Sequence, residues 1–213
     1  MGNHRDGRNL ELHRRIDEGL LGEPMSVRAG FGMPFPEDGS RWNPELGGST
    51  VLDQGIYPVT LAQSILGIPR GILASDTVRD GVDVSAQITL EFDGGRFAQL
   101  ACSALEFVEP TAGISGTQGW AVIDAMFWAG TSASLHAGSV EQIFGKPEKI
   151  VMKRQGNGYT PMLRAVCEAI SAGYIEEPGH DRKSTMEVAR TLEAVRDLVH
   201  LYAEGNKNEV FDI

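Results

Sequence analysis

The sequence has little cysteine, no dense run of positive charge and no long apolar segment. Only Cys102 and Cys167 occur, far apart and outside any Cys-x-x-Cys or Cys/His spacing, so the sequence predicts neither a disulfide framework nor a structural zinc site. We expect two reduced and mostly buried thiols. The formal net charge is -10, from 19 Lys and Arg against 29 Asp and Glu, which on average repels a phosphate backbone. Nucleic acid is therefore not an expected partner.

Signals for secretion and membrane insertion are also lacking. Residues 1–6 are polar with no apolar segment behind them, and no apolar run reaches the length needed to cross a bilayer. This favours a cytoplasmic protein with no membrane partner. The five histidines show no metal-ligand spacing, and no Ser/His/Asp or Cys/His arrangement indicates a nucleophile, so a metal site and hydrolase chemistry are both disfavoured.

The overall composition is typical of a globular protein. Hydrophobic residues make up 41% and charged residues 23% of the 213 residues, which fits neither a disordered nor a coiled-coil chain. A chain of this length folds as one large domain or two small ones and buries roughly 70% of its extended surface. Without internal repeats or low-complexity segments, we expect a single domain over residues 1–213.

The spacing of apolar residues changes twice along the chain, from helical to alternating and back. The helical pattern predicts helices at 10–21, 49–66, 161–172 and 183–204. The second should start at Ser49 or Thr50, stop at Gly67 and kink at Gly55 and Pro58. The alternating pattern predicts an antiparallel hairpin, 84–92 and 97–105 about a turn at 93–96, and further strands at 25–31, 72–78, 111–115, 120–125, 132–136 and 149–153. The expected fold is α+β: a large, mostly antiparallel open sheet of about six or seven strands with helices packed on one face.

The segment between the first strand and the second helix is the first place to look for a site. Residues 32–48 are rich in Pro, Gly and acidic residues, typical of a long ordered binding loop. Asp53 and Tyr57 follow at a spacing of four, which on a helix puts a carboxylate and a phenol on one face. A phenol with its pKa lowered by a nearby cation, or one in a hydrogen-bonded relay, can pass a proton to a substrate oxygen. The same spacing also fits a structural pair, with Asp53 bonded to a neighbouring group and Tyr57 in the core.

The run Gly47-Gly48-Ser49-x-x-x-Asp53-x-Gly55-x-Tyr57-Pro58 resembles the signature of the glucose-fructose oxidoreductase/inositol dehydrogenase (Gfo/Idh/MocA) family, which includes dihydrodiol dehydrogenases. Three further segments are similar to that family's helix-to-strand junction, substrate loop and late sheet turn: Ile16-Asp17-Glu18-Gly19-x-x-Gly22-Glu23-Pro24, Arg41-Trp42-x-Pro44 and Ile114-Ser115-Gly116-Thr117-Gln118-Gly119. The resemblance covers nearly the whole chain, but only the C-terminal, substrate and dimerisation half of the family's members.

The resemblance implies hydride transfer between NAD(P) and a hydroxyl-bearing carbon of a sugar, cyclitol or related substrate. Tyr57 would donate or accept the substrate proton and Asp53 would orient it. The substrate-binding residues it implies are Arg41, Trp42, Gly47 and Gly48. It also implies a homo-oligomer formed through the sheet face, where Phe97, Ala101 and Leu105 would add apolar surface to the uncovered side.

The family's Rossmann domain, with its Gly-rich turn and catalytic Glu-Lys-Pro, has no counterpart in this sequence. Residues 1–8 resemble the remnant of such a domain. The chain therefore looks like the substrate-side half of an enzyme, without its dinucleotide-binding half. We assign no cofactor-binding residues, and expect NAD or NADP to bind the parent enzyme and not this chain alone. Gly113-x-x-Gly116-x-x-Gly119 lacks the G-x-G-x-x-G spacing and is interpreted as a turn between strands, and Lys146 as a solvated side chain. The alternative is a non-catalytic module for sheet-mediated dimerisation or small-ligand binding.

Overall fold

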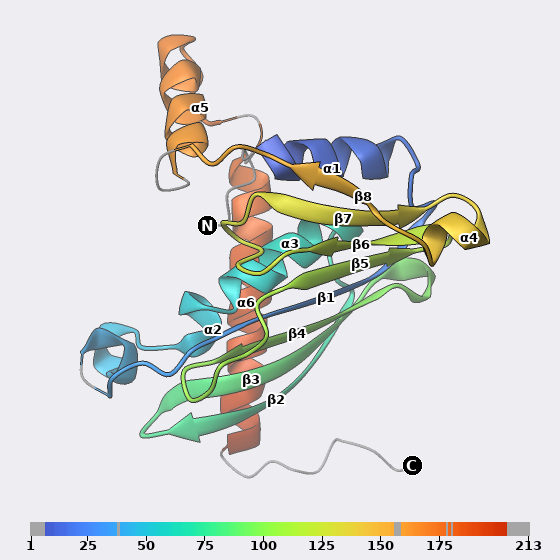
Figure 1. Ribbon diagram of the computed structural model, residues 1–213. Helices are drawn as coiled ribbons and strands as arrows, with labels where there is room; N and C mark the ends of the chain where they lie inside the picture. Colours follow the sequence, from blue (N-terminus) through green and yellow to red (C-terminus); the bar gives the residue numbers. More distant parts are fainter. Residues whose placement is uncertain (1–6, 38, 156–158, 178, 180, 204–213) are drawn as a thin grey trace.

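The computed structural model describes residues 7–37, 39–155, 159–177, 179 and 181–203. Its sheet has eight strands in the order β2-β3-β4-β1-β5-β6-β7-β8 (Figure 1). The strands are β1 (Pro24–Gly32), β2 (Gly71–Arg79), β3 (Val82–Glu91), β4 (Phe97–Ser103), β5 (Ala112–Gly116), β6 (Gly119–Ile123), β7 (Ser132–Ala137) and β8 (Glu148–Val151). Each predicted strand region is present, and the sheet is wider than the six or seven strands expected.

Strand β1 lies in the middle of the sheet although it comes first in the sequence. It runs parallel to β4, from Ser26 opposite Phe97 to Gly32 opposite Ser103, and antiparallel to β5. All other neighbouring strands are antiparallel. β2 to β4 form one meander and β5 to β8 a second, and β1 joins the two into a single sheet.

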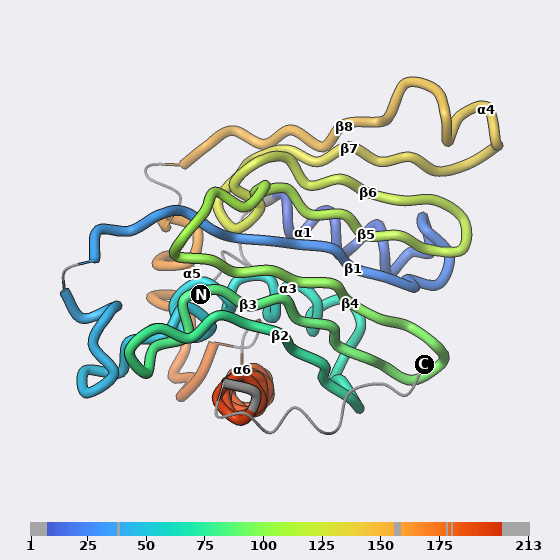
Figure 2. The backbone as a smooth tube through the Cα atoms, turned by 90° about the horizontal axis from the view of Figure 1, so that it is seen from below, coloured from blue at the N-terminus to red at the C-terminus, as the bar shows by residue number. Residues whose placement is uncertain are grey.

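The helices are α1 (Gly7–Asp17), α2 (Thr50–Asp53), α3 (Ile56–Leu66), α4 (Val140–Ile143), α5 (Thr160–Ser171) and α6 (Arg182–Ala203). Helix α6 packs against β2 and β3, α3 against β1 and β4, and α1 against β7 and β8. Figure 2 shows α6 end-on next to β2, while α5 projects from the body in Figure 1. The predicted fold, an open sheet with helices on one face, is confirmed.

The two faces of the sheet differ in chemistry. Apolar side chains at most 2% exposed fill the covered face, among them Ile88, Leu90, Leu100, Ile114 and Ile123. The alternate residues on the open face are mainly polar, such as exposed Gln87 and Gln99. The expected apolar surface on this face is small, because large exposed hydrophobic residues there are few and scattered, such as Phe97 at 41% on β4 and Leu73 at 45% on β2. Ala101 and Leu105 are half-buried, and Leu105 lies beyond the end of β4.

The predicted helix over 49–66 is two helices. α2 begins at the expected N-cap, where the Ser49 hydroxyl accepts a hydrogen bond from the Leu52 amide at 3.1 Å, and ends after one turn. α3 restarts at Ile56, so the expected kink is a break. Pro58 lies in the first turn of α3, where its missing N–H has no intrahelical partner to lose.

Several smaller expectations need correction. The predicted loop contains two short 3₁₀ helices, η1 (Ser40–Trp42) and η2 (Pro44–Leu46), and a further one, η3 (Asp93–Gly95), forms the hairpin turn. Helix α4 was not predicted, although it begins with a capping box on Ser139. Cys102 is buried as expected, but Cys167, on α5, is exposed.

Two further predictions concern the ends of the chain. Residues 1–6, expected to resemble the end of a preceding domain, lie outside the described residues, and Gly7 and Arg8 already belong to α1. The last helix ends within the described residues at Ala203, and position 204 lies outside them. Within the described part of the chain, no helix combines the length and apolar character needed to cross a membrane.

The turn between β5 and β6 packs on the segment that leads into β1. The Thr117 amide donates to the Glu23 carbonyl at 3.0 Å, and the Gln118 amide to the Leu21 carbonyl at 2.9 Å. These contacts join two of the segments that carried the family resemblance. They also bring Gly116 so close that a Cβ there would lie 2.2 Å from the Leu21 carbonyl oxygen.

We therefore expect Gly116→Ala to destabilise the fold by about 1–3 kcal/mol, because the added methyl group forces backbone to move. Gly113→Ala on the same strand is the matched control, since a Cβ there meets nothing within 4 Å. It should change stability by less than about 0.5 kcal/mol. Urea unfolding of both variants and the parent measures the difference, and equal stabilities would contradict the prediction.

Candidate active site

The loop after β1 and helix α2 bring Arg41 and Asp53 together. Arg41 Nε donates to Asp53 Oδ2 at 2.6 Å, with the two side chains 54% and 40% exposed. An exposed pair of this kind contributes about 0–1 kcal/mol to stability, so its main effect is to fix two charged groups relative to each other. The Arg41 guanidinium also lies over the Phe35 ring, 4.4 Å from its centre.

The two glycines of the motif support this loop. Gly47 follows η2 in the left-handed conformation, with φ of 77°. Gly48 approaches the backbone of Arg41 so closely that a Cβ would lie 2.6 Å from the Arg41 carbonyl oxygen. Both glycines thus shape the loop around Arg41. Trp42 is half-buried on η1, and its indole N–H has no hydrogen-bond partner among the described residues.

Tyr57 lies in the first turn of α3, within electrostatic range of Arg41 and Asp53. Its ring is packed edge-on against Phe31 with centroids 5.4 Å apart, and lies 5.7 Å from Trp128. Phe31 and Trp128 stack on each other at 4.0 Å. The neighbours of the Tyr57 phenol are thus the Arg41–Asp53 ion pair and the stacked rings of Phe31 and Trp128.

The pKa of Tyr57 is raised from its ordinary value, mainly because burial disfavours the phenolate. Interactions with Tyr159 and with the Asp53 carboxylate act in the same direction, and only Arg41 lowers it. We expected a nearby cation to lower this pKa. Arg41 does lower it, but the effect of burial is larger, so the pKa is raised. At neutral pH the phenol keeps its proton and can donate it.

The structure adds residues that the sequence motif did not reveal. Phe31 and Trp128 come from the end of β1 and from the segment between β6 and β7, and Tyr159 stands immediately before α5. A cavity of about 20 Å³ beside Tyr57 is also lined by His13 and Thr60, with Asn9, Leu61, Phe127 and Trp128. Burial lowers the pKa of His13, while Asp17 opposes this shift. Thr60 and Leu61 follow Tyr57 on α3 at helical spacing, but no spacing in the sequence connects the other residues with it, because four separate segments supply them.

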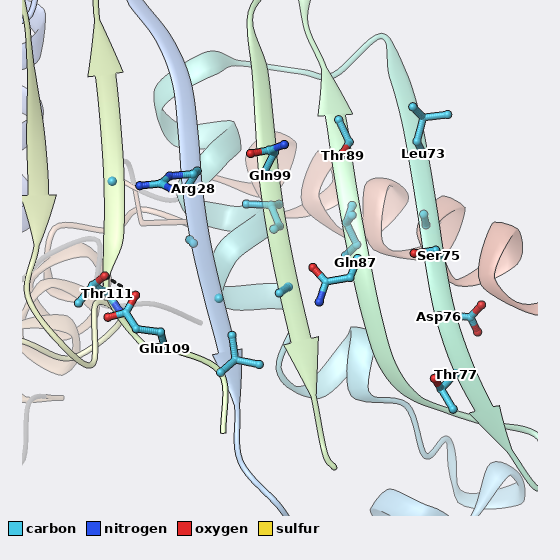
Figure 3. Close-up of a pocket in the computed structure, with 18 of the residues that line it drawn as sticks. Arg28, Leu73, Ser75, Asp76, Thr77, Gln87, Thr89, Gln99, Glu109 and Thr111 are labelled. Atoms are coloured by element: carbon cyan, nitrogen blue, oxygen red, sulfur yellow. Dashed lines mark hydrogen bonds between the residues drawn. The ribbon is translucent and has the colours of Figure 1, made fainter. Parts of the chain in front are cut away.

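A much larger hollow, about 1180 Å³, lies on the open face of the sheet and contains none of the predicted site residues (Figure 3). Polar side chains of four strands and of the segment before β5 point into it, including Arg28, Ser75, Gln87, Gln99 and Thr111. Among the described residues that line it, no ion pair joins an acidic to a basic side chain, so we place the candidate active site at Tyr57 and treat the hollow as a separate surface. Among the described residues, no group of three or more His, Cys, Asp or Glu side chains is placed to hold a metal ion.

Residues 9–122, more than half of the 213 residues, match the family described as the GFO/IDH/MocA C-terminal domain. The chain belongs to this family. The matched segment includes β1, the loop, α2 and α3, and with them Phe31, Arg41, Asp53 and Tyr57. The relatives in this family are oxidoreductases.

Curated relatives match the chain over most of its length. It is 27% identical over 202 residues to a dTDP-3,4-didehydro-2,6-dideoxy-alpha-D-glucose 3-reductase from Saccharopolyspora spinosa, covering 89% of the chain and 58% of the relative. It is 32% identical over 143 residues to a trans-1,2-dihydrobenzene-1,2-diol dehydrogenase from Danio rerio, covering 66% and 42%. The chain thus spans about half the length of the curated relatives it matches.

Solved structures show the same fold. An NAD binding oxidoreductase from Klebsiella pneumoniae superposes with a TM-score of 0.78 at 18% identity, over 93% of this chain and 62% of that one. A 3-ketoreductase from Actinomadura kijaniata, in complex with NADP and TDP-benzene, gives 0.75 at 23% identity, over 92% and 60%. At these identities the likeness establishes the architecture.

The charges around Tyr57 generate a prediction about its titration. Asp53→Asn should lower the Tyr57 pKa, because it removes a negative charge that disfavours the phenolate. Arg41→Gln should raise it, because it removes the one nearby charge that favours the phenolate. Alkaline titration by ultraviolet absorbance measures both shifts, with Tyr57→Phe subtracted to remove the other three of the four tyrosines. Identical Tyr57 titrations in the parent and both variants would show that the three groups do not interact.

Proposed function

We propose that this chain is the substrate-side domain of an NAD(P)-dependent oxidoreductase acting on a hydroxyl-bearing carbon of a sugar, cyclitol or related diol. The observation that carries the proposal is the phenol of Tyr57, held between the Arg41–Asp53 pair and the stacked rings of Phe31 and Trp128. The relatives' names support the substrate class, since they include a deoxysugar-nucleotide 3-reductase, a diol dehydrogenase and a D-xylose 1-dehydrogenase.

Tyr57 is the proton-transfer group in this proposal. Hydride transfer to or from an alcohol carbon must be matched by proton transfer at its oxygen. Since burial keeps the phenol protonated at neutral pH, Tyr57 donates its proton to the carbonyl oxygen when a ketone is reduced, which leaves a phenolate. In the reverse direction it is this phenolate that takes the hydroxyl proton as the alcohol is oxidised. Asp53, held by Arg41, orients the reacting groups, and the rings of Phe31 and Trp128 limit the access of water to the phenol.

The described residues do not themselves fit a dinucleotide. The glycines at 113, 116 and 119 lie in and between β5 and β6, with no helix N-terminus after the turn to receive a pyrophosphate. We therefore assign the dinucleotide to a domain outside these residues; its nicotinamide would supply or accept the hydride. Complexes of the Actinomadura kijaniata relative with NADP support the cofactor class.

Helix α5 offers a place for such a domain to dock. Its Ala169 is buried, but apolar side chains on another side of the helix are uncovered, with Leu163 and Ile170 exposed by 57% and 68%. Exposed apolar stripes on soluble proteins mark interaction surfaces. Tyr159, which immediately precedes α5, is near enough to raise the pKa of Tyr57, so the start of α5 lies on the same side of the molecule as the phenol. This continuity supports a two-domain enzyme over an isolated module.

The second candidate function is self-association through the open sheet face, either alongside catalysis or in a non-catalytic dimerisation module. The hollow of about 1180 Å³ lies on that face, whereas α3 and α6 lie behind the sheet on the other one (Figure 1). Side chains such as Gln87 and Gln99 can both donate and accept hydrogen bonds, as a self-complementary twofold interface requires.

In an enzyme that carries this chain with its dinucleotide domain, Tyr57→Phe should lower turnover by about 10²- to 10⁴-fold while leaving the fold and dinucleotide affinity nearly unchanged. Asp53→Asn should act in the same direction, and the double variant should lose less than the product of the single losses, because the two residues act as a unit. Tyr174→Phe, at an exposed tyrosine, is the matched control. Steady-state kinetics corrected for folded fraction makes the measurement. Parent turnover in Tyr57→Phe and Asp53→Asn would refute the catalytic roles.

For the sheet face, light scattering of the chain at micromolar concentration should give the mass of an oligomer. Gln87→Arg should shift it toward the monomer, because two copies would face each other with added positive charge. Glu193→Arg, at an exposed position on α6 and away from the sheet, should leave the mass unchanged. A monomer mass for the parent chain would count decisively against self-association.

A further inference from the structure

A β-bulge turns Asp83 away from the face on which its strand would otherwise place it. Along β3, Ser85, Gln87 and Thr89 lie on the open face, so strict alternation puts Asp83 there too. The register shifts between Thr77 and Val78: Thr77 pairs with Ser85, but Val78 pairs with Asp83. One extra residue in β3 reverses the alternation, and Asp83 is fully buried on the helix side.

The buried carboxylate holds the start of α2. Asp83 Oδ1 accepts a hydrogen bond from the Val51 amide at 2.7 Å, across 32 positions of sequence. Burial raises the pKa of Asp83, while the hydrogen bond from Val51, the neighbouring polar groups of Ser49 and Thr50 and the charge of His200 act in the opposite direction. The second carboxylate oxygen, Oδ2, is buried and has no hydrogen-bond partner among the described residues. Ser49, Thr50 and Val51 are the cap and first two residues of α2.

Helix α2 needs this support because it is a single turn. Four residues form too few internal hydrogen bonds to hold a helix by themselves. At its other end, the buried Gln54 side chain accepts a hydrogen bond from the Ser103 amide of β4 at 3.2 Å. Asp53, which pairs with Arg41, is the last residue of the turn so anchored.

Stability alone gives a poor account of a carboxylate in this position. Burying an ionisable group costs free energy, and the raised pKa means that the charged form is less favourable here than in water. The charge of Asp83 raises the pKa of Asp76 on β2 and of Cys102 on β4. Neither neighbour therefore favours a negative charge on Asp83. What the carboxylate secures is the place of α2 on the sheet, and with it the geometry of the charged pair.

We propose that Asp83 is a positioning residue that fixes Asp53, and through it Arg41, beside the phenol of Tyr57. This rests on the proposed function for the part that concerns catalysis. Asp83 touches neither substrate nor reacting atoms in this assignment. It acts through the backbone of α2, and the bulge in β3 is the feature of the sheet that makes the contact with that helix possible.

The test uses two substitutions in the chain as it is. Asp83→Leu removes the acceptor at similar volume, and Asp83→Asn keeps one acceptor oxygen for the Val51 amide. Loss of a helix cap corresponds to about a 5- to 30-fold change in a local equilibrium, so Asp83→Leu should speed amide hydrogen exchange at Val51 and Leu52 by that factor. Asp83→Asn should restore most of the protection. Exchange at core amides of β5 and β6 should stay at the parent rate in both.

The Tyr57 titration is the second readout. In Asp83→Leu the displaced charged pair should shift the Tyr57 pKa, whereas Asp76→Asn, on the neighbouring strand, should not. In a catalytically active holoenzyme, Asp83→Leu should lower kcat by up to about 10²-fold with little change in KM, as expected for misplaced catalytic groups.

Two results would overturn the proposal. One is parent-like exchange at Val51 and parent-like titration of Tyr57 in Asp83→Leu. The other is a uniform rise in exchange across the sheet with Tyr57 unchanged, which would make Asp83 a structural residue only. Neither the hydrogen-exchange measurement nor the Tyr57 titration requires a catalytically active enzyme. If Tyr57→Phe proved fully active, the proposed function would fail while exchange and titration still decided the role of Asp83.

Discussion

The pairing of β1 with both β4 and β5 is the constraint on which the rest of the structure depends. It joins two antiparallel meanders into one sheet, and a parallel neighbour such as β4 requires a long crossover connection. That connection carries the loop, α2 and α3 onto one face of the sheet. It also brings Phe31, near the end of β1, against Tyr57 of α3. The position of the candidate active site is thus a consequence of strand order.

The two faces of the sheet have different roles. The covered face buries a continuous apolar layer under α1, α3 and α6, which supplies most of the driving force for folding. Five of the eight buried polar residues in the described part of the chain lie where α2 meets β3 and β4: Ser49, Thr50, Gln54, Asp83 and Ser103. Burying polar groups is costly unless they are bonded, and here the bonds hold the one-turn helix that ends in Asp53. The fold therefore concentrates its polar contacts in the core beneath the site.

Around Tyr57, burial raises the pKa of the phenol and the charge of Arg41 lowers it, and the effect of burial is larger. The guanidinium of Arg41 favours the phenolate, but it is already paired with Asp53 in a well-exposed position where water screens its charge. Desolvation by the surrounding rings has no such screening. The result is a phenol that keeps its proton at neutral pH, which suits a proton donor to a substrate oxygen.

The sequence by itself determined the fold class, the strand regions and the motif that contains Asp53 and Tyr57, because alternation, capping residues and the Gly47–Pro58 run are local signals. It also indicated the N-cap at Ser49. It did not reveal that β1 lies between β4 and β5, that 49–66 is broken into two helices, or that the open face is mainly polar. Only the tertiary structure decided that Phe31, Trp128 and Tyr159 surround the phenol and that Asp83 turns inward. Contacts between distant segments and a one-residue bulge leave no periodic trace in the sequence, since they depend on which strands pair and in which register.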